Sequence, residues 1–195
     1  MKTRTIIIVM AMLLSNFLTN AQENKAVGIT KKGLQIGQQV PNFSMITLLN
    51  SEDKTLSLSS LKGKIVILDF WSTWCGPCVR AMPKLNSLQH EFKNDLQILL
   101  VTKDSANRVS KFFNLNNYAK GVKLPVIGLN ETTSALFPFT HMPHLVWINK
   151  QGDVLAITDT EALNRENIKD IIAQKPVVFI LKDDYKPKTK VDNKN

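Results

Sequence analysis

The fold of this chain is decided by the stretch Phe70-Trp71-Ser72-Thr73-Trp74-Cys75-Gly76-Pro77-Cys78, which contains both of its cysteines. A largely apolar run at residues 65–70 leads into this stretch, and a segment with helical periodicity follows it. Two cysteines spaced C-x-x-C can close a small disulfide ring and open it again. Because this pair lies between a strand and a helix, it predicts redox chemistry, with the rest of the chain as the scaffold of a dithiol.

The composition suits one folded domain with some additional residues. The chain has 195 residues, of which 44% are hydrophobic and 21% are charged, so it can bury a core without disulfide staples. The formal net charge is +9, and part of it comes from lysines near the two ends. Neither a nucleic-acid-binding motif nor a basic patch interleaved with aromatic residues accompanies this charge, so we expect no nucleic-acid partner.

The first 21 residues have the pattern of a secretory signal peptide. Lys2 and Arg4 form a positive start, residues 6–14 are an apolar run, and small residues end at Ala21, the expected cleavage site. The run is shorter than the roughly 20 apolar residues that span a membrane, although an uncleaved membrane anchor is the alternative. Either form places the folded part outside the cytoplasm, periplasmic or secreted, where a disulfide can persist.

Hydrophobic periodicity predicts alternating strands and helices in the middle of the chain. Strands are expected at residues 64–71, 96–101, 124–128, 144–149 and 154–158, and helices at 76–92, 105–114, 131–137 and 164–174. Short strands are expected between residues 34 and 49, and an alternating pattern continues through Leu56, Leu58 and Leu61. Buried strands that alternate with helices predict an α/β fold, with a central mixed β-sheet flanked by helices and an N-terminal β extension.

Domain boundaries follow from the same patterns. Residues 22–32 are expected to be a flexible leader, residues 33–175 the folded domain, and residues 176–195 a mostly disordered C-terminal tail. The apolar residues 177–181 are an exception within this tail. We interpret them as a further strand that pairs with the sheet edge or with a partner outside this chain.

Cys75 is the predicted nucleophile. It should lie at the N-terminus of the helix, where unpaired backbone N–H groups and the helix dipole favour a negative sulfur. Thiols in C-x-x-C motifs at such positions have lowered pKa values, and the thiolate is the reactive form. Cys78, one turn further and more buried, should resolve the mixed disulfide, while Gly76 and Pro77 set the turn between the two sulfurs.

Other interpretations of the cysteine pair explain it less well. A structural disulfide that closes so short a loop would stabilise the fold only weakly. Cys75, Cys78, His141 and His144 supply the residue types of a zinc site, but their spacing does not match the usual zinc-finger pattern. We therefore expect no bound metal, and a non-catalytic metal-binding or metallochaperone module is the alternative function. Covalent haem is excluded because Val79 follows Cys78 where histidine is needed.

Asp69 is the second candidate catalytic residue. A carboxylate within a buried strand is costly unless it has a partner, and burial raises its pKa. Strand parity places Asp69 beneath the start of the following helix. A buried acid there can take the proton of Cys78 as that thiol attacks. The alternative is an acid held by backbone groups or water.

The segment from Asp69 to Cys78 resembles the active site of the thioredoxin superfamily. The secretory leader, residues 37–43 and Met82-Pro83 resemble the TlpA/ResA-type extracytoplasmic thiol–disulfide oxidoreductases, and the resemblance covers residues 34–174. It implies a thioredoxin-like fold and catalysis on protein disulfides without a cofactor. The Gly-Pro pair between the cysteines resembles reducing members more than oxidising ones. A reductase outside the cytoplasm needs a membrane thiol electron donor.

The resemblance also implies a cis-proline loop that faces the dithiol, and Met142-Pro143 matches it. Pro143 would shape the surface where a substrate strand docks beside Cys75, and Trp74, Gly76 and Pro77 would form the active-site loop. His141 and His144 flank the loop. Their role is either functional, by tuning the thiolate or contacting the substrate, or structural, as surface or packing residues.

The sequence departs from its relatives at one position of the site. Many ResA-like members have a glutamate three residues after the second cysteine, whereas this chain has Ala81. The acid function would then fall to Asp69, which weakens any transfer of the cytochrome-maturation role of some relatives. The P-x-x-x-T-x-x-C pattern of peroxiredoxins is absent. The oligomeric state is left open by the sequence.

Overall fold

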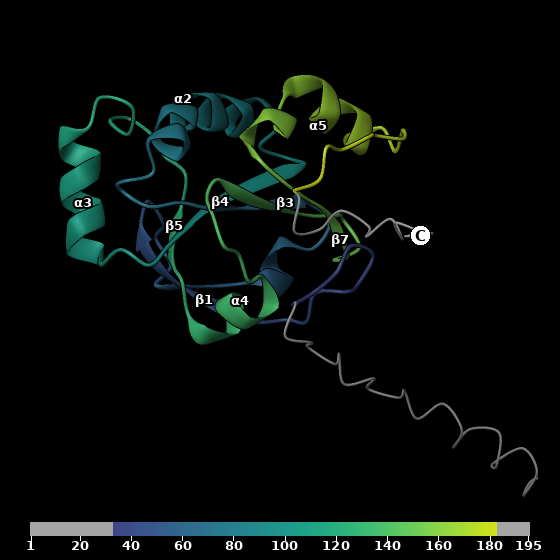
Figure 1. The fold of residues 1–195 in the computed structure, drawn as a ribbon, viewed down its shortest axis with the longest axis horizontal. Helices are drawn as coiled ribbons and strands as arrows, with labels where there is room; N and C mark the ends of the chain where they lie inside the picture. The colour runs from purple at the N-terminus through teal and green to yellow at the C-terminus, as the bar shows by residue number, and fades with distance from the viewer. Residues whose placement is uncertain (1–32, 183–195) are drawn as a thin grey trace, which may run out of the picture.

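The computed structural model describes residues 33–182 (Figure 1). The predicted signal peptide, the leader up to residue 32 and the tail from residue 183 onward lie outside this range. Within it, a seven-stranded sheet has the order β2-β1-β5-β4-β3-β6-β7, and helices cover both of its faces. The expected α/β class, with a central mixed sheet flanked by helices, is confirmed.

The elements have the following bounds. The strands are β1 (Ser44–Leu49), β2 (Thr55–Ser57), β3 (Ile65–Phe70), β4 (Leu96–Thr102), β5 (Val126–Gly128), β6 (His144–Ile148) and β7 (Val154–Thr158). The helices are α2 (Gly76–Glu91), α3 (Ala106–Leu115), α4 (Glu131–Leu136) and α5 (Arg165–Ile172), with short 3-10 turns η1 (Leu58–Leu61) and η2 (Thr160–Ala162).

Strand β3 is the centre of the sheet. It runs parallel to β4 on one side and antiparallel to β6 on the other, and all six of its residues are buried. A strand covered on both faces needs a nearly continuous hydrophobic sequence, which explains the apolar run in front of the cysteines.

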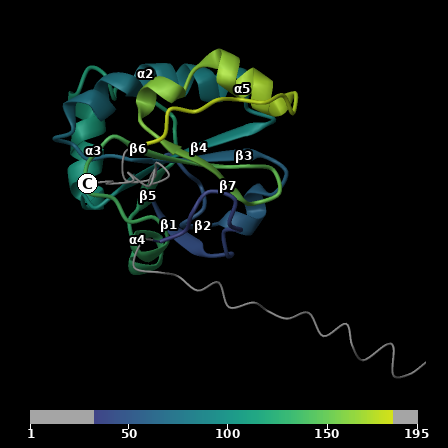
Figure 2. The same cartoon turned by 45° about the vertical axis from the view of Figure 1, so that its right-hand side comes forward.

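Two hydrophobic cores lie on opposite faces of the sheet. Figures 1 and 2 show α2 and α5 over one face and α4 against the other. Side chains alternate along β3, so Ile65 and Ile67 pack with α2, whereas Val66 and Leu68 pack in the core on the α4 side. The dithiol segment belongs to the α2 core, which includes both cysteines.

Leu58 and Leu61, which continue the alternating pattern, lie in the 3-10 turn η1 with both side chains buried. Two local expectations were wrong. Residues 34–43 are not a regular strand, although Gln39 forms an isolated bridge with Asp153. Residues 177–181 form no strand either. The segment bonds to β7 through the N–H of Lys182, which donates to the Ile157 carbonyl (3.1 Å), and not through a series of paired backbone hydrogen bonds.

Within residues 33–182, none of the helices has both the length and the apolar character needed to cross a membrane.

The buried centre of the sheet predicts a steep dependence of stability on side-chain volume. Ile67→Ala should lower the free energy of unfolding by about 3 kcal/mol, because it leaves a cavity in a fully buried strand. Ile46→Ala removes the same atoms from an exposed position on β1 and should cost no more than about 1 kcal/mol. Urea unfolding of both variants measures the difference, and equal losses would contradict the assigned burial.

Candidate active site

The cysteine segment begins where β3 ends. The N–H of Trp71 still donates to the Val101 carbonyl of β4 (2.9 Å), and the chain then leaves the sheet. A tight turn follows, in which the N–H of Cys75 donates to the Ser72 carbonyl (3.0 Å). Helix α2 starts at Gly76 with Cys75 as its N-cap. The sulfur of Cys75 therefore lies near unpaired N–H groups at the positive end of the helix dipole.

Cys75 and Cys78 are joined by a disulfide bond, with a Cα–Cα distance of 5.4 Å. Cys78 is fully buried, whereas Cys75 is 5% exposed and the neighbouring Trp74 is 71% exposed. A group from another protein therefore reaches the sulfur of Cys75 first. Pro77 lies in the first turn of α2, where its missing N–H costs no helical hydrogen bond.

The loop before the disulfide is anchored by two residues that sequence reasoning missed. The N–H of Thr73 donates to the Asp104 carboxylate (2.7 Å), and Arg108 Nε donates to the Thr73 hydroxyl (2.9 Å). Arg108 Nε also lies 3.7 Å from the Asp104 carboxylate. These partners are more than 30 residues away in sequence, so no local motif could indicate them.

Asp69 lies under the helix that carries the cysteines. Its position along β3 gives its side chain the same orientation as Ile65 and Ile67, toward α2, and its register neighbours are Leu100 and Leu145. The side chain is fully buried, and neither carboxylate oxygen has a hydrogen-bond partner among the described residues.

Burial raises the pKa of Asp69 from 3.8 to about 7. The charged form is disfavoured because the apolar surroundings replace water. A carboxyl group with a pKa near neutrality can both take and return a proton at physiological pH, as proton transfer from a buried thiol requires.

The Met142–Pro143 peptide bond is cis, and the loop lies beside the cysteine segment. The register pairs Phe70, the last residue of β3, with His144, the first residue of β6, so the loop before β6 adjoins the segment after β3. The Met142 side chain packs against the hydrophobic core that includes Cys75 and Cys78.

The two histidines that flank the loop do not share this arrangement. His144 is buried on the opposite face of the sheet, where it stacks on Phe139 and meets the edge of Phe70, each at 5.2 Å between ring centroids. The pKa of His144 is lowered to about 3, mainly by burial, with smaller electrostatic contributions from Lys182 and His141. His141 is exposed and its Nδ1 lies 3.0 Å from the Thr140 hydroxyl.

The Cys₂His₂ set is consequently not brought together. The two sulfurs are bonded to each other, and the imidazole of His144 lies beyond the sheet from them. Over residues 33–182, no group of three or more histidine, cysteine, aspartate or glutamate side chains is arranged to hold a metal ion.

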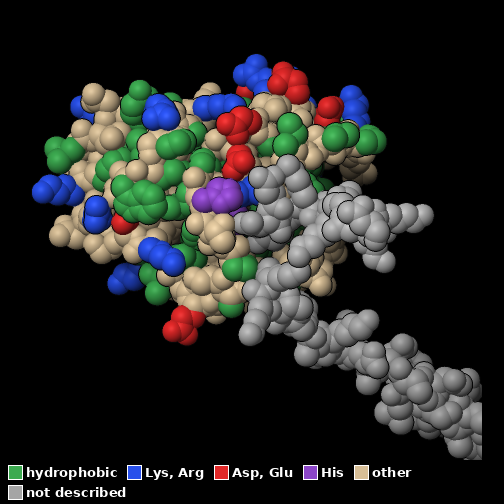
Figure 3. Space-filling view, in the orientation of Figure 1, with side chains coloured by type: hydrophobic (Ala, Val, Ile, Leu, Met, Phe, Trp, Pro, Cys, Tyr) green, Lys and Arg blue, Asp and Glu red, His purple; other side chains and the backbone are tan. Residues whose placement is uncertain are grey.

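The surface next to the dithiol is apolar and basic. A groove of about 410 Å³ runs from the cysteine segment along α3, lined by Thr73, Arg108, Lys111, Phe112, Leu115 and Asn116. Figure 3 shows Lys and Arg side chains among hydrophobic ones over α3. Exposed large apolar side chains such as Leu115 and Trp74 are typical of a surface that contacts other proteins.

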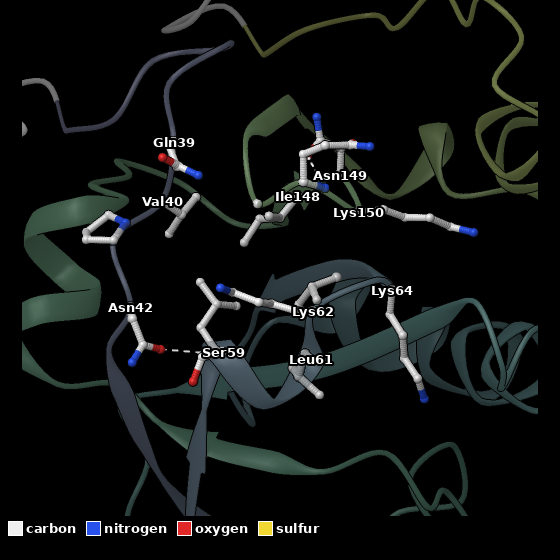
Figure 4. A pocket seen from close by; sticks show the side chains of 15 residues that line it. Gln39, Val40, Asn42, Ser59, Leu61, Lys62, Lys64, Ile148, Asn149 and Lys150 are labelled. Atoms are coloured by element: carbon white, nitrogen blue, oxygen red, sulfur yellow. Dashed lines mark hydrogen bonds between the residues drawn. The ribbon is translucent and has the colours of Figure 1, made fainter. Parts of the chain in front are cut away.

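A second pocket, of about 260 Å³, lies away from the dithiol (Figure 4). It is formed by residues 39–42, η1 and the β6–β7 hairpin, and it includes three lysines. Figure 4 shows Lys64 and Lys150 pointing away from its centre. Lys64 donates to the Lys93 carbonyl (3.0 Å), and Lys150 pairs with Asp95 (2.7 Å). Two of the three lysines are thus engaged by partners outside the pocket, and the pocket contains none of the candidate active-site residues.

A disulfide at the first turn of a helix, with a buried acid beneath it and a cis-proline loop beside it on a mixed sheet, defines a thiol–disulfide oxidoreductase with a thioredoxin-like fold. Comparison with known proteins agrees. The model of the AhpC/TSA family matches residues 36–154, so the chain belongs to this family.

Individual proteins similar to this chain include a named thiol-disulfide oxidoreductase and a solved structure. The thiol-disulfide oxidoreductase ResA of Bacillus thuringiensis (strain Al Hakam) is 35% identical over 127 residues, which cover 64% of this chain and 70% of the relative. The thioredoxin-like protein YneN of Bacillus subtilis (strain 168) is 46% identical over 79 residues, 40% of this chain and 45% of the relative. A crystal structure described as the thiol:disulfide interchange protein DsbE of Chlorobium tepidum is 26% identical to this chain, with a TM-score of 0.61. The match covers 72% of this chain and 99% of the crystallised chain. The resemblance stated from the sequence is confirmed.

The raised pKa of Asp69 predicts a pH-dependent stability. Because the carboxyl ionises near pH 3.8 in the unfolded chain and near 7 in the folded one, the folded protein binds one more proton between these values. The contribution of Asp69 to the free energy of unfolding is therefore greatest below pH 4 and falls as the pH rises to 7, by about 4 kcal/mol in total. Asp69→Asn should be more stable than the wild type above pH 7 by up to this amount, and equal to it near pH 4.

Urea unfolding of the oxidised proteins between pH 4 and 8 measures this difference. Asp53→Asn, on the exposed turn after β1, is the matched control and should follow the wild type throughout. A difference between Asp69→Asn and the wild type that does not change with pH would contradict the assigned ionisation.

Proposed function

We propose that the protein is a disulfide reductase that acts on protein disulfides outside the cytoplasm, with Cys75 as nucleophile and Cys78 as resolving cysteine. The observation that carries this proposal is the asymmetry of the pair, because only Cys75 reaches the surface and Cys78 is buried above the Asp69 face of the sheet. We assign the chemistry to residues 33–175 as one thioredoxin-like domain.

In the reduced protein the thiolate of Cys75 attacks one sulfur of a substrate disulfide. The substrate S–S bond breaks, a mixed disulfide with Cys75 forms, and the other substrate sulfur leaves as a thiolate that takes up a proton. Cys78 then attacks Cys75, so the mixed disulfide breaks and the second substrate thiolate leaves. Two electrons have passed to the substrate, and the Cys75–Cys78 disulfide present in the structure is the product.

Asp69 takes the proton of Cys78 in the second step. The thiol of Cys78 must ionise before it attacks, but it is enclosed by the protein. A carboxyl group with a pKa of about 7 on the same face of β3 accepts this proton and returns it when the pair is reduced again.

The Met142-Pro143 loop is the proposed docking site of the substrate strand, and Trp74, Gly76 and Pro77 form the opposing side of the contact. Neither the N–H nor the carbonyl of Met142 makes a hydrogen bond within the part of the chain that the structure describes. An extended substrate segment offers the complementary backbone groups, as in strand addition to a sheet edge.

The direction of electron flow and the location rest on the sequence. The Gly-Pro pair between the cysteines favours reduction, and the pattern of residues 1–21 favours secretion with cleavage after Ala21. Disulfides are stable outside the cytoplasm, so a reductase there must receive electrons from a donor, which we take to be a membrane thiol protein.

The assigned roles predict different failures for the two cysteines. Cys75→Ser should abolish the reduction of a protein disulfide such as insulin, because no thiolate remains at the surface. Cys78→Ser should retain the first step and accumulate a mixed disulfide on Cys75, visible by mass spectrometry and reversed by dithiothreitol. Retention of full activity by Cys75→Ser would overturn the proposal.

The proposed direction predicts a low reduction potential. Equilibration in dithiol/disulfide buffers, followed by alkylation and mass measurement, should give a value near the roughly −270 mV of thioredoxin. A value near about −120 mV would show that the pair makes disulfides instead.

A further inference from the structure

Lys182 is a buried lysine in a segment that the sequence assigned to the tail. Its side chain is only 1% exposed, although lysine is almost never fully buried unless it is paired. The Nζ atom donates to the carbonyl of His141 (2.8 Å) and to the carbonyl of Pro143 (2.9 Å), and it lies 4.0 Å from the Asp159 carboxylate. Carbonyl partners of this kind allow the ammonium group to remain charged without water.

Those two carbonyls lie on either side of Met142. One cation therefore binds the backbone directly before and directly after the residue whose own N–H and carbonyl are unengaged among residues 33–182. Hydrogen bonds at both flanks restrict the rotation of the intervening backbone. The loop is thus held in one conformation before any substrate arrives.

The segment that precedes Lys182 packs against the domain through alternate side chains. After α5 the chain returns toward the sheet, as the yellow trace in Figure 2 shows. Phe179 packs on Trp147 at 5.1 Å between ring centroids, and Leu181 packs against the α2 core. Val178 and Ile180 alternate with them and are 94% and 83% exposed. The N–H of Lys182 then donates to Ile157 of β7, which places the side chain behind the cis-proline loop.

We propose that Lys182 is a positioning residue for substrate docking, which fixes the Met142-Pro143 loop through the carbonyls of His141 and Pro143. The inference rests on the proposed function of that loop. Ordering the loop in advance removes an entropic cost from the binding of a substrate strand. The residue touches neither sulfur, so it acts on the affinity for extended polypeptides and not on the intrinsic reactivity of Cys75.

Lys182→Met tests this in the full-length protein, because it keeps the length and apolar part of the side chain and removes the charge. We expect the KM for insulin to rise about tenfold, because both hydrogen bonds that order the loop are lost, with little change in kcat. The reaction with the small disulfide DTNB and the reduction potential should stay as in the wild type. Lys182→Arg should restore most of the affinity, and Ile180→Ser, exposed on the same segment, is the matched control.

Hydrogen–deuterium exchange of the oxidised protein gives a readout that needs no activity. The amides of Thr140, His141, Met142 and His144 should exchange faster in Lys182→Met than in the wild type and the Ile180→Ser control. Lys182→Leu, which also has no hydrogen-bond donor, provides the same measurement if the methionine variant does not fold. Unchanged exchange, or equal losses with insulin and DTNB, would overturn the role of Lys182. Failure of the wild type to reduce insulin would instead overturn the proposed function and the docking role with it.

Discussion

The burial of Asp69 beneath the first turns of α2 is the constraint on which the rest of the site depends. Strand β3 needs cover on both faces because it is the centre of the sheet, and α2 supplies that cover on the side of the cysteines. The same cover removes water from a carboxyl group that has no hydrogen-bond partner in the described part of the chain. Packing and the proton transfer that we propose are therefore linked, since an α2 that packed less closely would let the acid ionise at its ordinary pKa.

Two titratable groups next to the β3–β6 pair show how one physical cause yields opposite results. Desolvation raises the pKa of Asp69 to about 7 and is the main cause that lowers the pKa of His144 to about 3, since in each case burial favours the neutral form. Only the pKa of Asp69 is thereby brought close to pH 7, where the group can exchange a proton. His144 stays neutral in an aromatic cluster on the opposite face.

Much of this arrangement was predictable because it is local in sequence. The apolar run of β3, the C-x-x-C spacing and the periodicity of α2 each lie within a few turns of chain, and Met142-Pro143 followed from the resemblance. The anchors of the loop, Asp104 and Arg108, and the contact of Lys182 with residues 141 and 143 join segments more than 30 residues apart. From composition, Lys182 was one more lysine of a polar tail. Its burial depends on the carbonyls of His141 and Pro143, which no sequence pattern indicates as its partners.

The segment at residues 176–182 also changes what the sheet offers to other chains. Strand β7 is an outer strand, and outer strands present backbone groups that any extended polypeptide can pair with. Here the N–H of Lys182 donates a hydrogen bond to the Ile157 carbonyl on the outer side of β7. The strand at the opposite edge of the sheet, β2, is only three residues long. A protein that handles extended segments of other proteins risks capturing them at the wrong place. With both edges curtailed, the docking site that we propose at Met142 has little competition from the rest of the sheet, and the Met142 side chain packs against the core that includes Cys75.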